Sequence, residues 1–122
     1  MKRDLKVYLE DILENLEIIS DYVKDIDEEE FSNSRQLQDA VIRRFEIVGE
    51  AAKQVPNGFR SKHPHIPWRK MAGLRDVLIH HYFGVSVGRV GKMIEDDLDK
   101  TKEGISEIIN QLPDPETDTD RA

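Results

Sequence analysis

The 122-residue sequence contains no cysteine, only 5 prolines, and no apolar run longer than a few residues. The absence of cysteine excludes a disulfide scaffold, a thiol nucleophile and a zinc site built on thiolates. The short apolar runs exclude a membrane-spanning helix. The charged first residues also lack the unbroken apolar stretch of a signal peptide. These absences predict one cytoplasmic domain with no membrane association.

Charge is unevenly distributed along the chain, whose net charge is −7. Residues 1–52 and residues 93–122 each carry a balance of −7, whereas residues 53–92, the basic segment, carry +7 with a single acid, Asp76. All four histidines lie in the basic segment. This concentration of cations indicates a site for a phosphate-bearing ligand. The alternative is that the acidic flanks neutralise the segment by pairing within the molecule.

Apolar residues recur every three or four positions in four stretches, which is the pattern of amphipathic helices. The predicted helices run from Leu5 to Val23, from a cap at Asn33 to Val55, from Pro67 to a left-handed Gly84, and from a cap at Ser86 to Leu112. Residues 25–30 are expected to form an acidic loop, and residues 59–66 an irregular stretch.

The spacing contains no strand alternation, so the predicted fold class is all-α. We expect an up-down helical bundle of four to five helices over residues 1–112, with sequential helices as antiparallel neighbours. Residues 113–122 contain no large apolar group and are expected to form a disordered acidic tail. Gly88 and Gly91 weaken the last helix, or else permit another helix to approach it closely.

The densest group of polar side chains ends the third predicted helix. Within eight residues, Arg75, His80, His81 and Tyr82 bring together a guanidinium, two imidazoles and a phenol. An imidazole with a pKa of about 6.5 exchanges protons at neutral pH, and a guanidinium holds two phosphate oxygens. Neither step requires a metal or a cofactor. The set is therefore suited to cleaving RNA through its ribose 2′-hydroxyl, which DNA lacks.

Helix geometry limits this interpretation. Arg75 and His80 are about 140° apart around an ideal helix, whereas Arg75 and Tyr82 are about 20° apart. Either the helix distorts near its end, or the second copy in a two-fold dimer completes the site. A structural interpretation also stays open, in which the histidines cap helix carbonyls and Arg75 pairs with a carboxylate of the second helix.

The remaining histidines and cations of the basic segment carry weaker signals. His63 and His65 lie close together, but no neighbouring Asp, Glu or Cys completes a ligand set, so no metal site is predicted. Lys62, His63, Arg69 and Lys70 are instead the candidates for contacts with RNA phosphates.

The segment from Pro67 to Val85 resembles the HepT-like branch of the HEPN-domain ribonucleases, and residues 38–53 and 4–12 resemble the same branch. The similarity covers about residues 3–112. The family motif is an arginine, four to six residues, and a histidine. Here it corresponds to Arg75 and His80, with the tyrosine of the branch at Tyr82 two positions later.

The resemblance implies an α-helical homodimer with the two motifs at a composite cleft. It implies a metal-independent endoribonuclease that cleaves tRNA or mRNA as the toxin of a type VII toxin–antitoxin pair. Arg75 and His80 would form the catalytic pair, with Asp76 and His81 in support. The implied partner is a minimal nucleotidyltransferase antitoxin that transfers AMP from ATP onto Tyr82. The alternative is a non-enzymatic helical dimer that binds a nucleotide or a protein partner.

Overall fold

The computed structural model describes the backbone of residues 4–80 and 83–112, and the side chains of residues 4–74 and 88–112. This part of the chain forms six helices and no strand, so the predicted all-α class is confirmed. The helices are α1 (Leu5–Val23), α2 (Glu28–Asn33), α3 (Arg35–Gln54), α4 (Asn57–Lys62), α5 (Trp68–His80) and α6 (Phe83–Gln111). The predicted tail lies outside the described residues.

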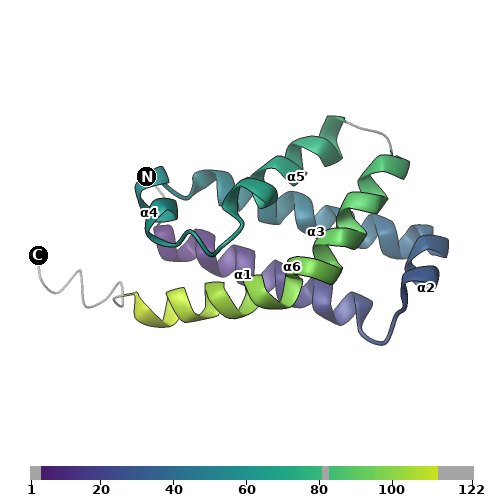
Figure 1. Cartoon of the computed structure of the whole chain (residues 1–122), viewed down its shortest axis with the longest axis horizontal. Coiled ribbons are helices and arrows are strands. Elements are labelled where there is room, and N and C mark those ends of the chain that lie inside the picture. The colour runs from purple at the N-terminus through teal and green to yellow at the C-terminus, as the bar shows by residue number, and fades with distance from the viewer. Residues whose placement is uncertain (1–3, 81–82, 113–122) are drawn as a thin grey trace, which may run out of the picture.

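The four long helices are arranged around α3. α1 and α3 run antiparallel, and α5 crosses α3 on the side away from α1 (Figure 1). α3 packs against both α1 and α5, while α6 contacts α1, α3 and α5. α6 changes direction along its length, so that it starts near the end of α5 and finishes alongside α1 (Figure 1). The end of α5 and the start of α6 therefore lie at an edge of the bundle.

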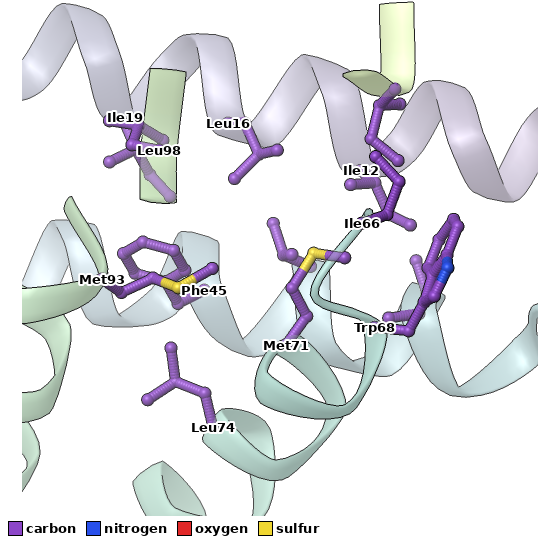
Figure 2. Packing of buried hydrophobic residues seen from close by; sticks show 14 of the residues in the cluster. Ile12, Leu16, Ile19, Phe45, Ile66, Trp68, Met71, Leu74, Met93 and Leu98 are labelled. Atoms are coloured by element: carbon purple, nitrogen blue, oxygen red, sulfur yellow. The ribbon is translucent and has the colours of Figure 1, made fainter. Parts of the chain in front are cut away.

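One cluster of buried apolar side chains holds the long helices together. On α1 and α3 its buried members follow helical spacing, and they include Leu9, Ile12, Leu16, Ile19, Val41, Phe45 and Val48. Met71 and Leu74 of α5 and Met93 of α6 belong to the same cluster (Figure 2). The apolar stripes predicted from the sequence are thus the buried faces. Among the described residues, no helix combines the length and the apolar character needed to cross a membrane.

The expected acidic loop at residues 25–30 is wrong, because α2 begins within it. Asp27 Oδ1 accepts the Glu30 N–H at 2.8 Å, and Glu30 Oε1 accepts the Asp27 N–H at 3.5 Å. This reciprocal capping box starts the helix, and acidic side chains in the first turn interact favourably with its dipole. The predicted cap of the next helix is also off by one residue. Ser34 Oγ, and not Asn33, accepts from the Leu37 N–H at 3.1 Å.

The expected irregular stretch after α3 is also partly helical, since α4 occupies residues 57–62. Its residue Arg60 explains the tight connection. The guanidinium donates from Nε to the Val55 carbonyl at 3.0 Å and from Nη2 to the Ala52 carbonyl at 2.6 Å. These bonds satisfy carbonyls at the C-terminus of α3. One cation of the basic segment therefore has a structural role.

The start of α5 is close to the predicted position. The first helical bond runs from the Met71 N–H to the Pro67 carbonyl at 3.1 Å, so Pro67 occupies the cap rather than the first helical position. Trp68 is buried, and its Nε1–H donates to the His63 carbonyl at 3.0 Å. The connection before α5 is thereby attached to the helix that carries the candidate site.

The junction between α5 and α6 falls earlier than the sequence predicted. The prediction that Gly84 ends a helix in the left-handed conformation is wrong, because α6 already begins at Phe83 and no described glycine has a positive φ. Ser86 accordingly lies inside α6 and is not its cap. The apolar period explains the earlier start, since Phe83, Val87 and Val90 recur at steps of four and three residues.

The close approach to α6 occurs at a different glycine from those predicted. A Cβ added to Gly88 or Gly91 would meet nothing within 4 Å. At Gly104 the same atom would lie 2.5 Å from Cδ1 of the buried Ile66. The absence of a side chain at Gly104 therefore lets the connection before α5 pack against the second half of α6.

Candidate functional site

The predicted catalytic pair lies on α5, close to its junction with α6. The backbone is helical from Trp68 through His80, so Arg75 and His80 belong to one continuous helix. Only two residues separate the end of α5 from Phe83, the first residue of α6. The ideal helical separation of about 140° therefore applies to the predicted catalytic pair.

The side chains of the predicted catalytic, supporting and modification residues lie outside the described part of the chain. These residues are Arg75, Asp76, His80, His81 and Tyr82. What the structure does describe is the surface that leads up to them along α5 and away from them along α6. That surface contains the strongest concentration of positive charge among the described pockets.

A pocket of about 590 Å³ opens between α5 and α6, and is named here the α5–α6 pocket. It is lined by Arg69, Lys70, Gly73, Leu74, Arg89, Lys92, Met93 and Asp97. The four cations against one carboxylate give this lining a balance of +3 on a chain whose net charge is −7. All four cations are exposed, whereas Leu74 and Met93 are only 7% and 5% exposed. The pocket thus has a cationic rim and an apolar floor.

One ion pair crosses this pocket. Lys70 Nζ of α5 lies 3.1 Å from Asp97 Oδ2 of α6. The lysine side chain is 66% exposed, and the aspartate 21%. An ion pair this close to solvent contributes at most about 1 kcal/mol to the stability of the fold. Its main consequence is local, because Asp97 partly neutralises one of the four cations.

The sequence predicted half of this cationic set. Arg69 and Lys70 were expected to contact RNA, and the structure places both on the rim. Arg89 and Lys92 belong to the same basic segment but were not assigned to a site. Their spacing of three residues, which puts both on one face of a helix, is the signal that could have identified them.

The other two predicted RNA contacts lie elsewhere. Lys62 is exposed at the end of α4, and neither it nor His63 lines the α5–α6 pocket. The His63 ring packs against Phe59, with 4.7 Å between ring centroids, and lies 6.1 Å from the His65 ring. His63 is therefore part of the aromatic packing that precedes α5.

A second pocket, of about 490 Å³, has the opposite electrostatic character. It lies where the end of α1, α2 and the first half of α6 meet, and Asp27, Glu28, Glu95 and Asp96 contribute to its lining. Lys92 is the single cation there. Four carboxylates repel a polyanion, so this pocket is unsuited to binding nucleic acid.

The described residues contain no group of three or more His, Asp or Glu side chains placed to hold a metal ion.

Comparison with known proteins identifies similar chains. The family model described as "Ribonuclease HepT-like" matches residues 12–108. A Methanocaldococcus jannaschii protein named "Gamma-glutamylcyclotransferase and putative RNase" is 49% identical over 92% of this chain, which spans only 50% of that relative. A "Putative RNase" of the same organism is 44% identical over 88% of this chain and 98% of its own length. A "Probable ribonuclease HepT" of Thermococcus cleftensis is 49% identical over 84% of this chain and 93% of its own length. No solved structure matches the chain with statistical significance.

Proposed function

The chain belongs to the HepT-like ribonuclease family, and we propose that it is a metal-independent endoribonuclease with Arg75 and His80 as its catalytic pair. The observation that best supports this proposal is the position of both residues on the one helix, α5, that also borders the α5–α6 pocket. A local balance of +3 attracts a polyanion to the motif in spite of the acidic remainder of the chain.

In the proposed reaction the His80 imidazole removes the proton from a ribose 2′-hydroxyl. The resulting oxygen attacks the adjacent phosphorus, so that a P–O2′ bond forms and the P–O5′ bond breaks. A second imidazole, from His81 or from the partner protomer, gives a proton to the leaving 5′-oxygen. Arg75 stabilises the charge on the phosphoryl oxygens, and Asp76 orients Arg75. The products are a 2′,3′-cyclic phosphate and a 5′-hydroxyl.

We propose further that the active site is shared between two protomers. On a continuous helix, Arg75 and His80 diverge by about 140°, so a single copy of α5 does not point both at one phosphate. Both residues belong to the second half of α5, whose end lies at an edge of the bundle (Figure 1), and such a position would let a second copy contribute. A two-fold axis beside this edge would bring Arg75 of one protomer towards the partner's His80.

The first expected result is cleavage of RNA without a divalent metal. Purified protein should cut single-stranded RNA in the presence of EDTA, because the general base and the charge stabiliser are both side chains. A strand of the same sequence with deoxyribose throughout should stay intact, since it lacks the attacking hydroxyl. Gel electrophoresis of end-labelled strands measures both. Cleavage that requires added Mg²⁺ would contradict the mechanism, and binding without any cleavage would favour the non-enzymatic alternative.

We also propose that the chain is the toxin of a toxin–antitoxin pair and that its partner is a minimal nucleotidyltransferase. In the proposed control step the Tyr82 phenol oxygen attacks the α-phosphorus of ATP. The new bond joins the phenol to AMP, and pyrophosphate leaves. The attached group adds a phosphodiester charge and considerable bulk next to the cationic surface, so it repels and blocks the RNA backbone.

Mass spectrometry can test this modification. With the partner enzyme and ATP, the intact mass of the wild-type chain should rise by one or more AMP units, and Tyr82→Phe should show no rise because it lacks the nucleophilic oxygen. Tyr22→Phe is the matched control, since Tyr22 is 39% exposed on α1 and also offers a phenol. Modification that persists in Tyr82→Phe and disappears in Tyr22→Phe would refute the assignment.

A further inference from the structure

The α5–α6 pocket has a property that the catalytic motif does not require. It combines a ring of exposed cations with an apolar floor, and its volume of about 590 Å³ lies in the range typical of small-molecule sites. A surface that only attracts phosphates needs charge and no hollow. A hollow with both features matches one nucleotide, which has an anionic phosphate and an apolar base.

We infer that the α5–α6 pocket is a subsite for one unpaired nucleotide of the RNA substrate, located beside the cleavage site. This inference rests on the proposed function for the identity of the ligand as RNA. Arg69, Arg89 and Lys92 hold the phosphate, and the base lies on the floor formed by Gly73, Leu74 and Met93.

The floor can receive a base because α5 carries a glycine there. A Cβ built on Gly73 would have no atom within 4 Å, so the space in front of this residue is open. Leu74 and Met93 are buried, and both belong to the same core cluster as Phe45 (Figure 2). A thioether at the edge of an aromatic ring is a favourable contact. A base must leave its own stack to make these contacts, which selects single-stranded RNA.

Asp97 adjusts the affinity of this subsite. Its carboxylate lies 3.1 Å from Lys70 Nζ, so in the free protein Asp97 pairs with the lysine that would otherwise bind a phosphate. Because the lysine side chain is 66% exposed, it can exchange this partner for an RNA phosphate without any change of fold. Asp97 is therefore a competitor of the RNA backbone, and removing its charge should strengthen binding.

The test measures binding separately from cleavage. The probe is a fluorescein-labelled single-stranded RNA of roughly 12 nucleotides, within the range of single-strand site sizes, with a 2′-O-methyl group on every ribose to prevent cleavage. Fluorescence anisotropy of the full chain gives the dissociation constant at several salt concentrations. The logarithm of the association constant falls linearly with the logarithm of the salt concentration. Each lost phosphate contact should make this line less steep, by about 0.7.

Removing two rim cations should weaken binding in a salt-dependent manner. Arg89→Gln/Lys92→Gln is expected to lose about tenfold in affinity at low salt and to reduce the magnitude of the salt slope by about 1.4. The matched control is Arg43→Gln/Lys100→Gln, which removes the same charge from exposed positions that do not line the pocket. The control should retain the wild-type slope. Equal losses in both double variants would overturn the inference, since attraction would then come from overall charge.

Two single variants separate the phosphate contacts from the base contacts. Asp97→Asn should bind the probe more tightly than the wild type and steepen the salt slope by about 0.7, because Lys70 becomes free. Gly73→Leu should fill the floor and weaken binding while the salt slope stays unchanged, because all cations remain. Leucine is also a better helix former than glycine, and circular dichroism verifies that the variant folds.

The outcomes distinguish this inference from the proposed function. Failure of the wild type to bind the probe overturns the subsite, even if the protein cleaves RNA. Probe binding with the expected variant effects supports the subsite, even if cleavage is never observed. If the rim variants lose the nucleotidyltransferase partner and keep the probe, the pocket is a protein contact and the inference is wrong.

Discussion

His80→Ala and Arg75→Ala are each expected to lower the rate of RNA cleavage at least about a hundredfold. The first change removes the general base, and the second removes the group that stabilises charge on the phosphoryl oxygens. Single-turnover cleavage of an end-labelled RNA, with EDTA present, measures both rates. A factor of one hundred corresponds to about 2.7 kcal/mol of transition-state stabilisation.

Matched variants separate this loss from general damage. His65→Ala and Arg43→Ala remove the same side-chain types from exposed positions outside the α5–α6 pocket, and should cleave at close to the wild-type rate. Thermal unfolding of all four variants verifies that they remain folded. Wild-type activity in His80→Ala would contradict the catalytic assignment directly.

Mixing the two inactive variants tests whether the site is shared. If each site takes Arg75 from one protomer and His80 from the other, a mixed dimer contains one intact site and one doubly altered site. With random re-association, half of the dimers are mixed, so about a quarter of the wild-type activity should return. If both groups of a site come from the same protomer, every site stays defective and the mixture remains inactive.

The long helices could be predicted because burial imposes a period on the sequence. Leu9, Ile12 and Leu16 recur at steps of three and four, and the structure buries all three. α1 accordingly has the predicted bounds.

The short helices could not be predicted by the same means, because they depend on contacts between side chains and the backbone. Gln38 of α3 donates from Nε2 to the carbonyls of Phe31 and Ser32 at 2.8 and 2.9 Å, and thus caps α2. Arg60 does the same for α3. These bonds join residues five to eight positions apart, and the apolar spacing of the sequence does not predict them.

The candidate site shows the same division. The motif residues were predicted from residue type, spacing and the family resemblance, and two of the rim cations from the charge of the basic segment. The pocket itself depends on how α6 crosses α5, which brings Arg89 and Lys92 opposite Arg69 and Lys70. The ion pair between Lys70 and Asp97 joins residues 27 positions apart, and only packing determines that they meet.

The core beneath this pocket should be highly sensitive to truncation. Phe45 is 1% exposed and belongs to the cluster that contains Met93 and Leu74 (Figure 2). Phe45→Ala is expected to lower the free energy of unfolding by about 3–5 kcal/mol, because it removes buried apolar area and leaves a cavity. A domain of this size is typically stable by only about 5–15 kcal/mol. Urea unfolding followed by circular dichroism, at one fixed protein concentration, measures the change.

Tyr22→Ala provides the matched control, because it truncates an aromatic side chain that is 39% exposed. Its expected cost is within about 0.5 kcal/mol, since little buried area is lost. Phe45→Leu retains apolar volume and should cost roughly half as much as the alanine variant. If Phe45→Ala and Tyr22→Ala were equally stable, this result would contradict the buried position of Phe45. It would also contradict the floor of the α5–α6 pocket, which belongs to the same cluster.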